Sequence, residues 1–294
     1  MPTDARRVPA PLLVLGGILS VNVGAAIAAT LIRDLGPLLT VTIRLDSAAV
    51  ILLLAAQPSI RGRSRRDWGA VLALGVSLAA MNVCFYTAIG RLPLGVVVTV
   101  EFLGPLGVAA AGSRRPRDIL AVLVALAGVM AASGALTVAW ASLDLVGLAF
   151  AVAAGAGWAA YIVATRSVGG RWRQLDGLAM AMIIGAVIVT PLGIVSAQGI
   201  AISGSQLATG AAIGVLSSVV PYSLELLALR RIATNVFGIL LSVEPAVSAL
   251  IGFILLGQAL AAPQVAGMGL VVAASALVLT AQHEPPEVEA AEIA

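Results

Sequence analysis

The sequence contains no lysine, one cysteine and one histidine, and only 11% of its 294 residues are charged. A disulfide framework or a cysteine metal site needs more than one cysteine, and Cys84 stands alone inside an apolar run. Because the single histidine, His283, lies near the C-terminus, a histidine relay within the apolar part of the chain is also excluded. We therefore expect neither a cofactor nor a metal ion.

Apolar residues dominate the rest of the chain. They make up 60% of it and give a mean hydropathy of +1.07. A soluble domain carries about 25% charged residues, so too little polar surface remains here to coat a globule in water. Apolar stretches of about 20 residues recur along the chain, each long enough to cross roughly 30 Å of hydrocarbon. The expected environment is a lipid bilayer.

The apolar stretches lack the alternation of barrel strands, and the helix is the other structure that satisfies backbone polar groups within lipid. The expected fold class is an all-α membrane protein with ten transmembrane helices. They cover residues 11–32, 37–56, 69–89, 94–112, 119–138, 144–165, 178–197, 206–229, 234–256 and 263–281. The first stretch follows two arginines, as in a signal peptide, but its length favours a retained helix.

Arginine supplies every basic residue, and its placement predicts the orientation of the chain. With the N-terminus inside, the loops on that side hold fourteen arginines: Arg6, Arg7, Arg61, Arg63, Arg65, Arg66, Arg114, Arg115, Arg117, Arg166, Arg171, Arg173, Arg230 and Arg231. The opposite loops hold only Arg33 and Arg91. Because cytoplasmic loops carry the excess of positive charge, we expect a multi-pass protein of the bacterial inner membrane with both termini cytoplasmic. Because the arginines mark the orientation of the chain, the pI near 9.7 does not indicate a nucleic-acid partner.

An internal echo at an offset of 140 residues divides the chain into two halves. Residues 88–96 align with 228–236, and Pro105 falls opposite Pro245. Since each half has five helices, an odd number, the halves must be inverted relative to each other. We expect a cytoplasmic tail at 1–10, five-helix repeats at 11–138 and 144–281, and a disordered acidic tail at 282–294.

Five charged residues fall at membrane depth. They are Arg44, Asp46, Glu101, Glu225 and Glu244. A charged side chain at the bilayer centre costs about 2.5–3.5 kcal/mol even on insertion scales. Residues this costly face a water-filled path or one another.

Helical spacing groups other polar residues with these charges. Ser218, Tyr222 and Glu225 follow each other at intervals of four and three, which places them on one helix face. Asn82 and Tyr86 are four residues apart and also share a face. These residues are candidates to line a cavity.

Each candidate also has a structural explanation. Glu225 is close enough to the cytoplasmic end of its helix to reach toward Arg230 or Arg231. Arg44 and Asp46 are two residues apart, so they point to different faces, and each could pair with another helix.

Three further candidates have alternatives as well. Asn82 could be a hydrogen-bonding contact between helices. Trp158 and Tyr161 share a face, and either packing or lining a cavity explains both.

Glu101 and Glu244 are the hardest to explain structurally. Both lie near the middle of their expected helices, and both stand beside a helix-breaking proline, Pro105 or Pro245. A proline frees a backbone carbonyl one turn earlier, so we expect interrupted helices and polar backbone groups near both glutamates.

Several stretches of the chain carry a family likeness. In the first half they are 75–86, 93–95, 100–105 and 113–118, and in the second half they are 221–225 and 242–246. They resemble the bacterial threonine and homoserine exporters, which belong to the EamA branch of the drug/metabolite transporter superfamily. The likeness spans residues 11–281. One departure is Gly257-Gln258, where the family usually has Gly-Glu.

The resemblance implies two inverted five-helix repeats, export of small amino acids by proton antiport with alternating access, and a central cavity. The cavity is expected among the helices at 69–89, 94–112, 206–229 and 234–256. The implied partners are the solute, protons, the lipid bilayer and, as one alternative, a second copy of the chain in a homodimer. Nucleic acid is not among them.

A mechanism is hypothesised from these residues. Glu101 and Glu244 alternate between holding a proton and facing the substrate ammonium group. Arg44 or the N-terminus of a broken helix receives the substrate carboxylate. Asn82, Tyr86 and Tyr222 hydrogen-bond a side-chain hydroxyl group.

Other functions compete with amino-acid export. Export of a drug or of another metabolite by the same superfamily is the nearest alternative. An intramembrane aspartyl protease needs two aspartates at depth, and only Asp46 is present. Serine–histidine chemistry lacks its buried histidine, and a purely structural subunit would not retain so many charges in lipid. We therefore expect no enzyme.

Overall fold

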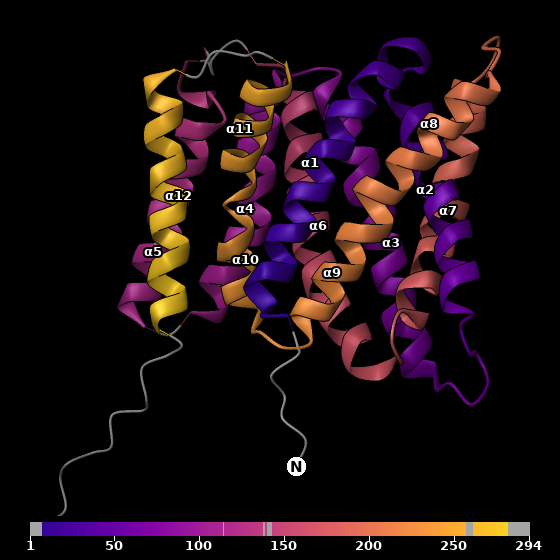
Figure 1. Cartoon of the computed structure of the whole chain (residues 1–294), viewed down its shortest axis with the longest axis horizontal. Coiled ribbons are helices and arrows are strands. Elements are labelled where there is room, and N and C mark those ends of the chain that lie inside the picture. The colour runs from indigo at the N-terminus through magenta and orange to yellow at the C-terminus, as the bar shows by residue number, and fades with distance from the viewer. Residues whose placement is uncertain (1–7, 114, 138, 140–142, 257–260, 282–294) are drawn as a thin grey trace, which may run out of the picture.

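The computed structural model describes residues 8–113, 115–137, 139, 143–256 and 261–281, and within these ranges the secondary structure is helical with no strand. Figure 1 shows the helices running roughly side by side. The α-helices are α1 (Ala10–Leu35), α2 (Pro37–Ala56), α3 (Arg65–Ile89), α4 (Leu94–Gly112), α5 (Pro116–Ala132), α6 (Leu145–Arg171), α7 (Asp176–Ser196), α8 (Gly204–Gly214), α9 (Val220–Leu229), α10 (Thr234–Leu241), α11 (Glu244–Leu256) and α12 (Ala262–Ala281). A 3₁₀-helix, η1 (Ala135–Thr137), and a π-helix, η3 (Val215–Val219), complete them.

Each range expected from the sequence falls on one helix or on consecutive helices. Seven helical segments of the described chain are long and apolar enough to cross a membrane, and two shorter apolar helices accompany them, Val96–Gly112 and Ala262–Leu277. Large apolar side chains are exposed on the outside of the bundle, for example Leu54 at 69% and Val187 at 67%. Such a surface is suited to lipid.

Local sequence accounts for where several helices begin. Ser64 caps α3 in a reciprocal capping box with Asp67, and Ser203 caps α8 in the same way with Gln206. The carboxylate of Asp144 caps α6 by accepting from two backbone N–H groups. Because proline has no N–H to leave unpaired, it is well placed in the first turn of α1, α2 and α5.

The prolines interrupt the helices differently from the expectation. The prediction of a break at Pro105 was wrong, because α4 continues through that residue. In the second half the chain does break, between Leu241 and Glu244, so that Pro245 lies in the first turn of α11. Pro221 follows the π-helix η3, whose wider turn accommodates the missing backbone donor.

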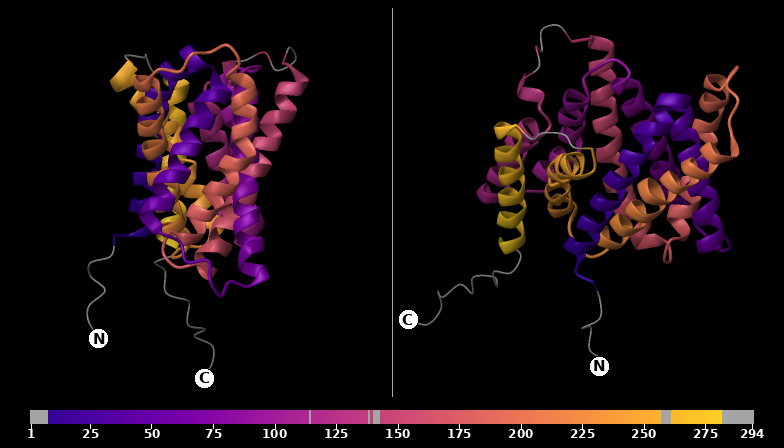
Figure 2. Two further views of the ribbon diagram at one scale, coloured as in Figure 1. Left: turned by 90° about the vertical axis from the view of Figure 1, so that its right-hand side faces the viewer. Right: turned by 45° about the horizontal axis from the view of Figure 1, so that its top comes forward.

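Helix pairs pack closely through small residues. A Cβ atom on Gly104 of α4 would lie 2.0 Å from the carbonyl oxygen of Gly155 on α6, so only glycine permits this approach. Gly24 of α1 meets Ser217 of η3 in a similar contact. Helix α5 packs against α12 at one end of the bundle, whereas α2 packs against α7 and α8 at the other (Figures 1 and 2).

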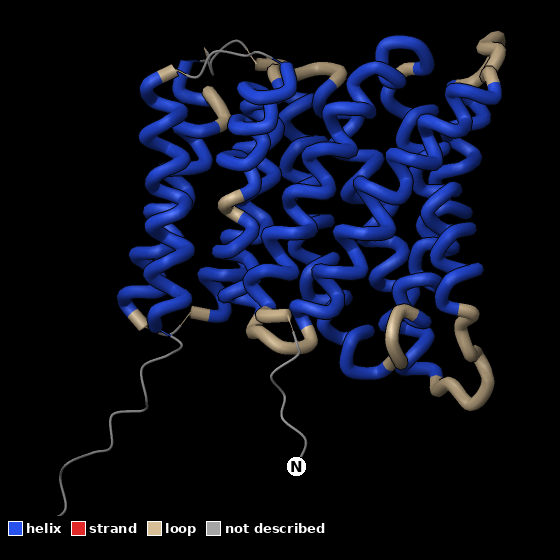
Figure 3. The backbone as a smooth tube through the Cα atoms, viewed as in Figure 1, coloured by secondary structure: helices blue, strands red, loops and turns tan. Residues whose placement is uncertain are grey.

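Most arginine-bearing loops gather at one face, which we call the lower face after its place in Figure 1. The α2–α3, α6–α7 and α9–α10 connections lie there (Figure 3), and α1 begins and α12 ends there. The predicted acidic tail at 282–294, most of the predicted tail at 1–10, and Gly257-Gln258 lie outside the described residues.

Candidate functional site

A cavity of about 590 Å³ lies inside the bundle between α1, α3, α4, α9 and α11. Eight of the residues that the sequence singles out line it: Arg44, Asn82, Tyr86, Glu101, Trp158, Tyr222, Glu225 and Glu244. It reaches Ile32 and Ile89 near the ends of α1 and α3, and Gln264 near the start of α12. These helix ends lie opposite the lower face (Figure 1), so the cavity extends toward the upper face.

Arg44 is the one basic side chain among the cavity residues. It is only 7% exposed, it donates to the Oδ1 atom of Asn82, and it lies 3.5 Å from the hydroxyl of Tyr86. Its guanidinium carbon also lies 5.6 Å from the ring centre of Tyr86. Within the described chain Arg44 forms no ion pair, and its Nε has no hydrogen-bond partner. A buried guanidinium group with a spare donor is suited to bind an anion.

Asp46 lies elsewhere, although it is only two residues from Arg44. It is half-buried between α2 and α7, where the hydroxyl of Thr190 donates to its carboxylate at 2.8 Å. It does not border the cavity. The structure therefore separates the two charges of α2, and only Arg44 lies at the cavity.

A series of side-chain contacts begins at Arg44 and continues along the cavity. The amide nitrogen of Asn82 lies 3.4 Å from the hydroxyl of Tyr222. The Tyr222 ring packs against the ring of Tyr161, with centroids 5.4 Å apart. The Tyr161 hydroxyl donates to Glu225 at 2.7 Å. Tyr161 is fully buried and does not line the cavity, so it supports Glu225 from outside the cavity lining.

The alternative that Glu225 binds a nearby arginine does not describe this structure. The side chain of Arg230 donates to backbone carbonyls of the α6–α7 connection, and that of Arg231 donates to the carbonyl of Val8. The described partner of the Glu225 carboxylate is Tyr161.

Glu101 and Glu244 lie together at the opposite wall of the cavity, close enough to interact electrostatically. Neither carboxylate has a hydrogen-bond or ion-pair partner in the described part of the chain. Beside them the rings of Phe102 and Trp158 meet edge to face, with centroids 4.9 Å apart. Among the described residues, no group of three or more His, Cys, Asp or Glu side chains is placed to hold a metal ion.

Sequence reasoning left other polar cavity residues out of the candidate site. Asn22 lines the cavity and is 8% exposed, while Ser20 of the same helix turns away and donates to the Leu216 carbonyl. Ser248 and Gln264 also line it. Ser248 lies one turn after Glu244 on α11, and Gln264 lies in the first turn of α12. Neither position carries a signal without the neighbouring helices.

Two arginines join α6 to the end of α9 at the lower face. Arg166 of α6 and Arg230 of the α9–α10 turn donate across to each other's segments, and we call this pair the arginine clasp. The accepting backbone carbonyls are those of Leu229 and Ile232 for Arg166, and those of Gly169, Trp172 and Gln174 for Arg230. Charged donors to neutral carbonyls make strong hydrogen bonds, so the clasp ties α6 to α9.

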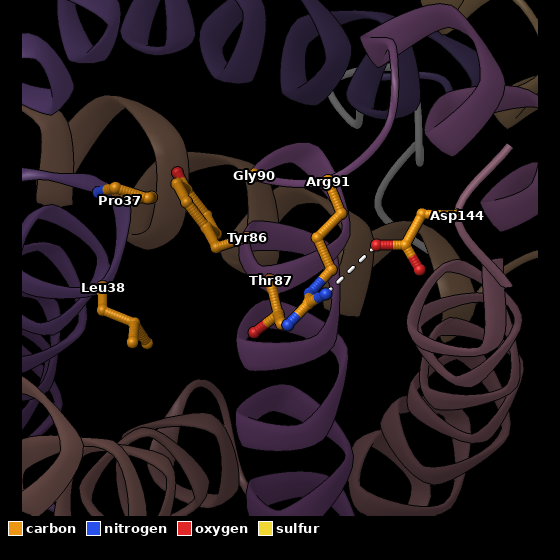
Figure 4. Close-up of a pocket in the computed structure, with 7 residues that line it drawn as sticks. All are labelled: Pro37, Leu38, Tyr86, Thr87, Gly90, Arg91 and Asp144. Carbon is orange, nitrogen blue, oxygen red and sulfur yellow. Dashed lines mark hydrogen bonds and ion pairs between the residues drawn. The ribbon is translucent and has the colours of Figure 1, made fainter. Parts of the chain in front are cut away.

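A second, shallower pocket of about 520 Å³ opens at the upper face (Figure 4). Tyr86 borders both this pocket and the central cavity. Across it, Arg91 forms an ion pair with Asp144 at 3.1 Å. The backbone N–H of Gly147, together with Arg91 and the N–H of Val146, lowers the pKa of Asp144. Because one Asp144 oxygen already caps α6 and the other faces Arg91, the pair is a strut between α3 and α6.

Long apolar helices around a cavity lined by charged side chains define a multi-pass membrane protein built to hold a polar solute within the bilayer.

Comparison with known proteins narrows this class. Residues 145–280 match the model of the EamA-like transporter family. The chain is 37% identical to the threonine/homoserine exporter RhtA of Salmonella typhimurium strain LT2 over 289 residues, which cover 97% of each chain. It is 36% identical to RhtA of Escherichia coli strain K12, with 94% of each chain covered.

The chain therefore belongs to the EamA-like transporter family, a family of transporters and not of enzymes. A solved crystal structure of a protein of 20% identity superimposes with a TM-score of 0.76, covering 94% of this chain and 99% of that one. At this identity the likeness concerns the fold alone.

Proposed function

We propose that this protein exports threonine, homoserine and similar small amino acids across the bacterial inner membrane in exchange for protons. The observation that carries the proposal is Arg44, a buried basic side chain at the cavity that has no acidic partner, and whose Nε has no hydrogen-bond partner, in the described chain. The exporters that resemble the chain along 94–97% of its length are named for this cargo.

Arg44 binds the carboxylate of the amino acid through its free Nε and a neighbouring N–H. Asn82 and Tyr86 hold the guanidinium group in place, since both already contact it. Tyr222 and Asn82 offer hydrogen-bonding groups to a side-chain hydroxyl. From α6, Trp158 lines the cavity, and Tyr161 holds the Glu225 carboxylate through a hydrogen bond.

Glu101 and Glu244 alternate between holding a proton and facing the substrate ammonium group. Their proximity supports this scheme, because two neighbouring carboxylates in a cavity of low polarity favour a shared proton or a bound cation. A proton that enters with the membrane potential gains roughly 2.3 kcal/mol per 100 mV, which supports more than a tenfold solute gradient.

Alternating access accounts for the asymmetry between the two faces. The cavity extends to the upper face, and the arginine clasp closes the lower one. We assign the lower face, where the arginine-bearing loops lie, to the cytoplasm, together with both chain termini. This arrangement corresponds to an outward-facing state, and opening inward requires the clasp to separate.

The packing of the helices supports ten spans in two inverted repeats, 11–138 and 144–281. Here α8, η3 and α9 form one span, and α10 and α11 form another. An offset of 140 residues maps α2 onto α7, α4 onto α10 and α5 toward α12, and each of these pairs packs together. The same offset relates the contact between α3 and α6 to the contact between α9 and α1. Such reciprocal contacts are those expected of two halves related by a two-fold axis. At the cavity, Asn82 contacts Tyr222, the residue that lies 140 positions further along the chain.

The proposal is tested by efflux of radiolabelled threonine and homoserine from proteoliposomes that contain the purified protein. We expect efflux to rise when the outside is made acidic, and to lose this response in Glu101→Gln and Glu244→Gln. Asp118→Asn, in the first turn of α5 and outside the cavity, is the matched control. Proton-coupled efflux that is intact in both glutamate variants would refute the proposed coupling.

Another metabolite or a drug is the alternative cargo within the same superfamily. Cells that overproduce the protein are grown with an excess of single amino acids, analogues and drugs. Survival in threonine and homoserine supports the proposed cargo, and survival only in an unrelated compound identifies another.

A further inference from the structure

The cavity is large for a single small amino acid. Pockets that hold drug-sized molecules have volumes of roughly 300–1,000 Å³, and this cavity of about 590 Å³ lies within that range. Threonine, a much smaller molecule, leaves most of the space to water. The volume therefore admits a longer solute of the same chemical kind.

The charged groups of the cavity lie on opposite walls. Arg44 is on α2, which packs against α3, α7 and α8. Glu101 is on α4, which packs against α5, α6 and α10, and Glu244 begins α11 on the same side. Figure 1 shows α1, α6 and α9 between these two groups of helices. An anion site and a cation site thus face each other across the width of the cavity.

Uncharged hydrogen-bonding groups also line the cavity, on α1 and on α11 one turn after Glu244. Asn22 of α1 uses its amide nitrogen on the carbonyl of Ile18, 2.8 Å away, which leaves its Oδ1 oxygen as a free acceptor in the described structure. Ser248 of α11 contributes an exposed hydroxyl to the cavity. An acceptor and a hydroxyl are the partners that a peptide N–H and a peptide C=O require.

We propose that the same cavity also carries dipeptides of small amino acids. The terminal carboxylate binds Arg44, the terminal ammonium group binds Glu101 or Glu244, and the peptide group meets Asn22 and Ser248. The inference rests on the proposed function, because it uses the same cavity and the same coupling to protons. It differs in the length of the solute that joins the two walls.

Efflux of labelled L-alanyl-L-threonine from proteoliposomes tests the inference, because purified protein in lipid contains no peptidase that would release threonine. We expect acid-stimulated efflux of the dipeptide and mutual competition with threonine. N-acetyl-L-alanyl-L-threonine lacks the ammonium group, and its efflux should be slower by about tenfold or more, the effect of losing a charge-assisted hydrogen bond. Arg44→Gln should reduce efflux of the dipeptide and of threonine alike.

The outcomes separate this inference from the proposed function. Threonine efflux without dipeptide efflux would overturn the inference and leave the exporter intact, and so would a dipeptide that inhibits threonine efflux without crossing the membrane. Equal efflux of the acetylated dipeptide would overturn the assignment of its ammonium site. If neither threonine, homoserine nor the dipeptide leaves the vesicles, the proposed function fails and the inference fails with it.

Discussion

Two arginines of this protein, Arg44 in the cavity and Arg230 at the lower face, show how differently one side chain is used. Arg230 donates to three backbone carbonyls, at 3.0, 2.9 and 2.6 Å, and its role is to join two segments. Arg44 is more deeply buried, yet its contacts are a side-chain amide and a phenol, and its Nε is left over. Burial of a charge without full pairing is costly, so the unpartnered Nε of Arg44 indicates a ligand, whereas the three bonds of Arg230 to backbone carbonyls indicate a structural role.

The largest effect on efflux is expected when Arg44 is replaced. Arg44→Gln deletes the charge that meets the solute carboxylate, and threonine efflux should fall by about a hundredfold, since two charge-assisted hydrogen bonds are lost. Arg44→Lys keeps the charge but loses the planar pair of donors, and it should retain part of the activity. Arg61→Gln, in the exposed α2–α3 loop, is the control and should export like the wild type. Equal efflux by Arg44→Gln and the wild type would abolish the contrast between the two arginines.

A smaller effect is expected when the clasp is opened. Arg230→Ala removes three hydrogen bonds between α9 and the α6–α7 connection, which should raise the population of the inward-open state by about tenfold. Leu226 of α9, which is fully buried beside Gly169, is the reporter position. With Cys84 replaced by alanine, Leu226→Cys should react faster with an impermeant maleimide applied at the cytoplasmic face.

Arg231→Ala is the matched control for the clasp. Arg231 is the next residue in the same turn, but it donates to the carbonyl of Val8 and not to α6. If both alanine variants label Leu226→Cys at the same rate, the clasp is not what closes the lower face.

Two glycines of α4 differ in their surroundings, because Gly104 packs against another helix and Gly107 does not. Gly104→Ala places a methyl group against the carbonyl oxygen of Gly155, and we expect a loss of about 1–3 kcal/mol of stability. A Cβ atom on Gly107, three residues later, meets nothing within 4 Å, so Gly107→Ala should be neutral or slightly stabilising. Thermal unfolding in detergent measures both. A lower melting temperature for Gly107→Ala than for Gly104→Ala would contradict the packing of α4 on α6.

The smallest effect is expected at the exposed strut between Arg91 and Asp144. Backbone N–H groups and Arg91 lower the pKa of Asp144, so its contribution to stability is complete above the ordinary aspartate pKa and is lost as the pH falls through the lower folded-state value. Asp144→Asn should therefore melt slightly below the wild type between about pH 5 and pH 8, and the difference should vanish in stronger acid. A difference that grows as the pH falls would show that the strut is not formed.

Much of the helical fold could be predicted from the sequence, because length and apolarity alone determine a span. The expected ranges 37–56 and 94–112 coincide with α2 and α4. The break after Leu241 and the π-helix at Val215–Val219 could not be placed. Proline signals that a helix is weakened, but its packing partners decide whether the helix breaks, widens or, as at Pro105, continues.

The cavity residues could be predicted to the extent that polar groups are costly in lipid. That cost makes Asp46 a candidate, and a helix face shared with Trp158 makes Tyr161 one. The structure satisfies both away from the cavity wall, through Thr190 and Glu225. Periodicity tells which residues share a helix face, but it does not tell which helix lies opposite. Asn22 is an amide within the first apolar stretch, and only the neighbouring helices show that it faces the cavity.

A structure of the protein with homoserine bound tests the central claim most directly. We expect the solute carboxylate within about 3 Å of the Arg44 Nε, with the ammonium group toward the glutamates. Homoserine bound in the outer pocket between Arg91 and Asp144, with the Arg44 Nε still unpartnered, would contradict the assignment of Arg44 as the substrate site.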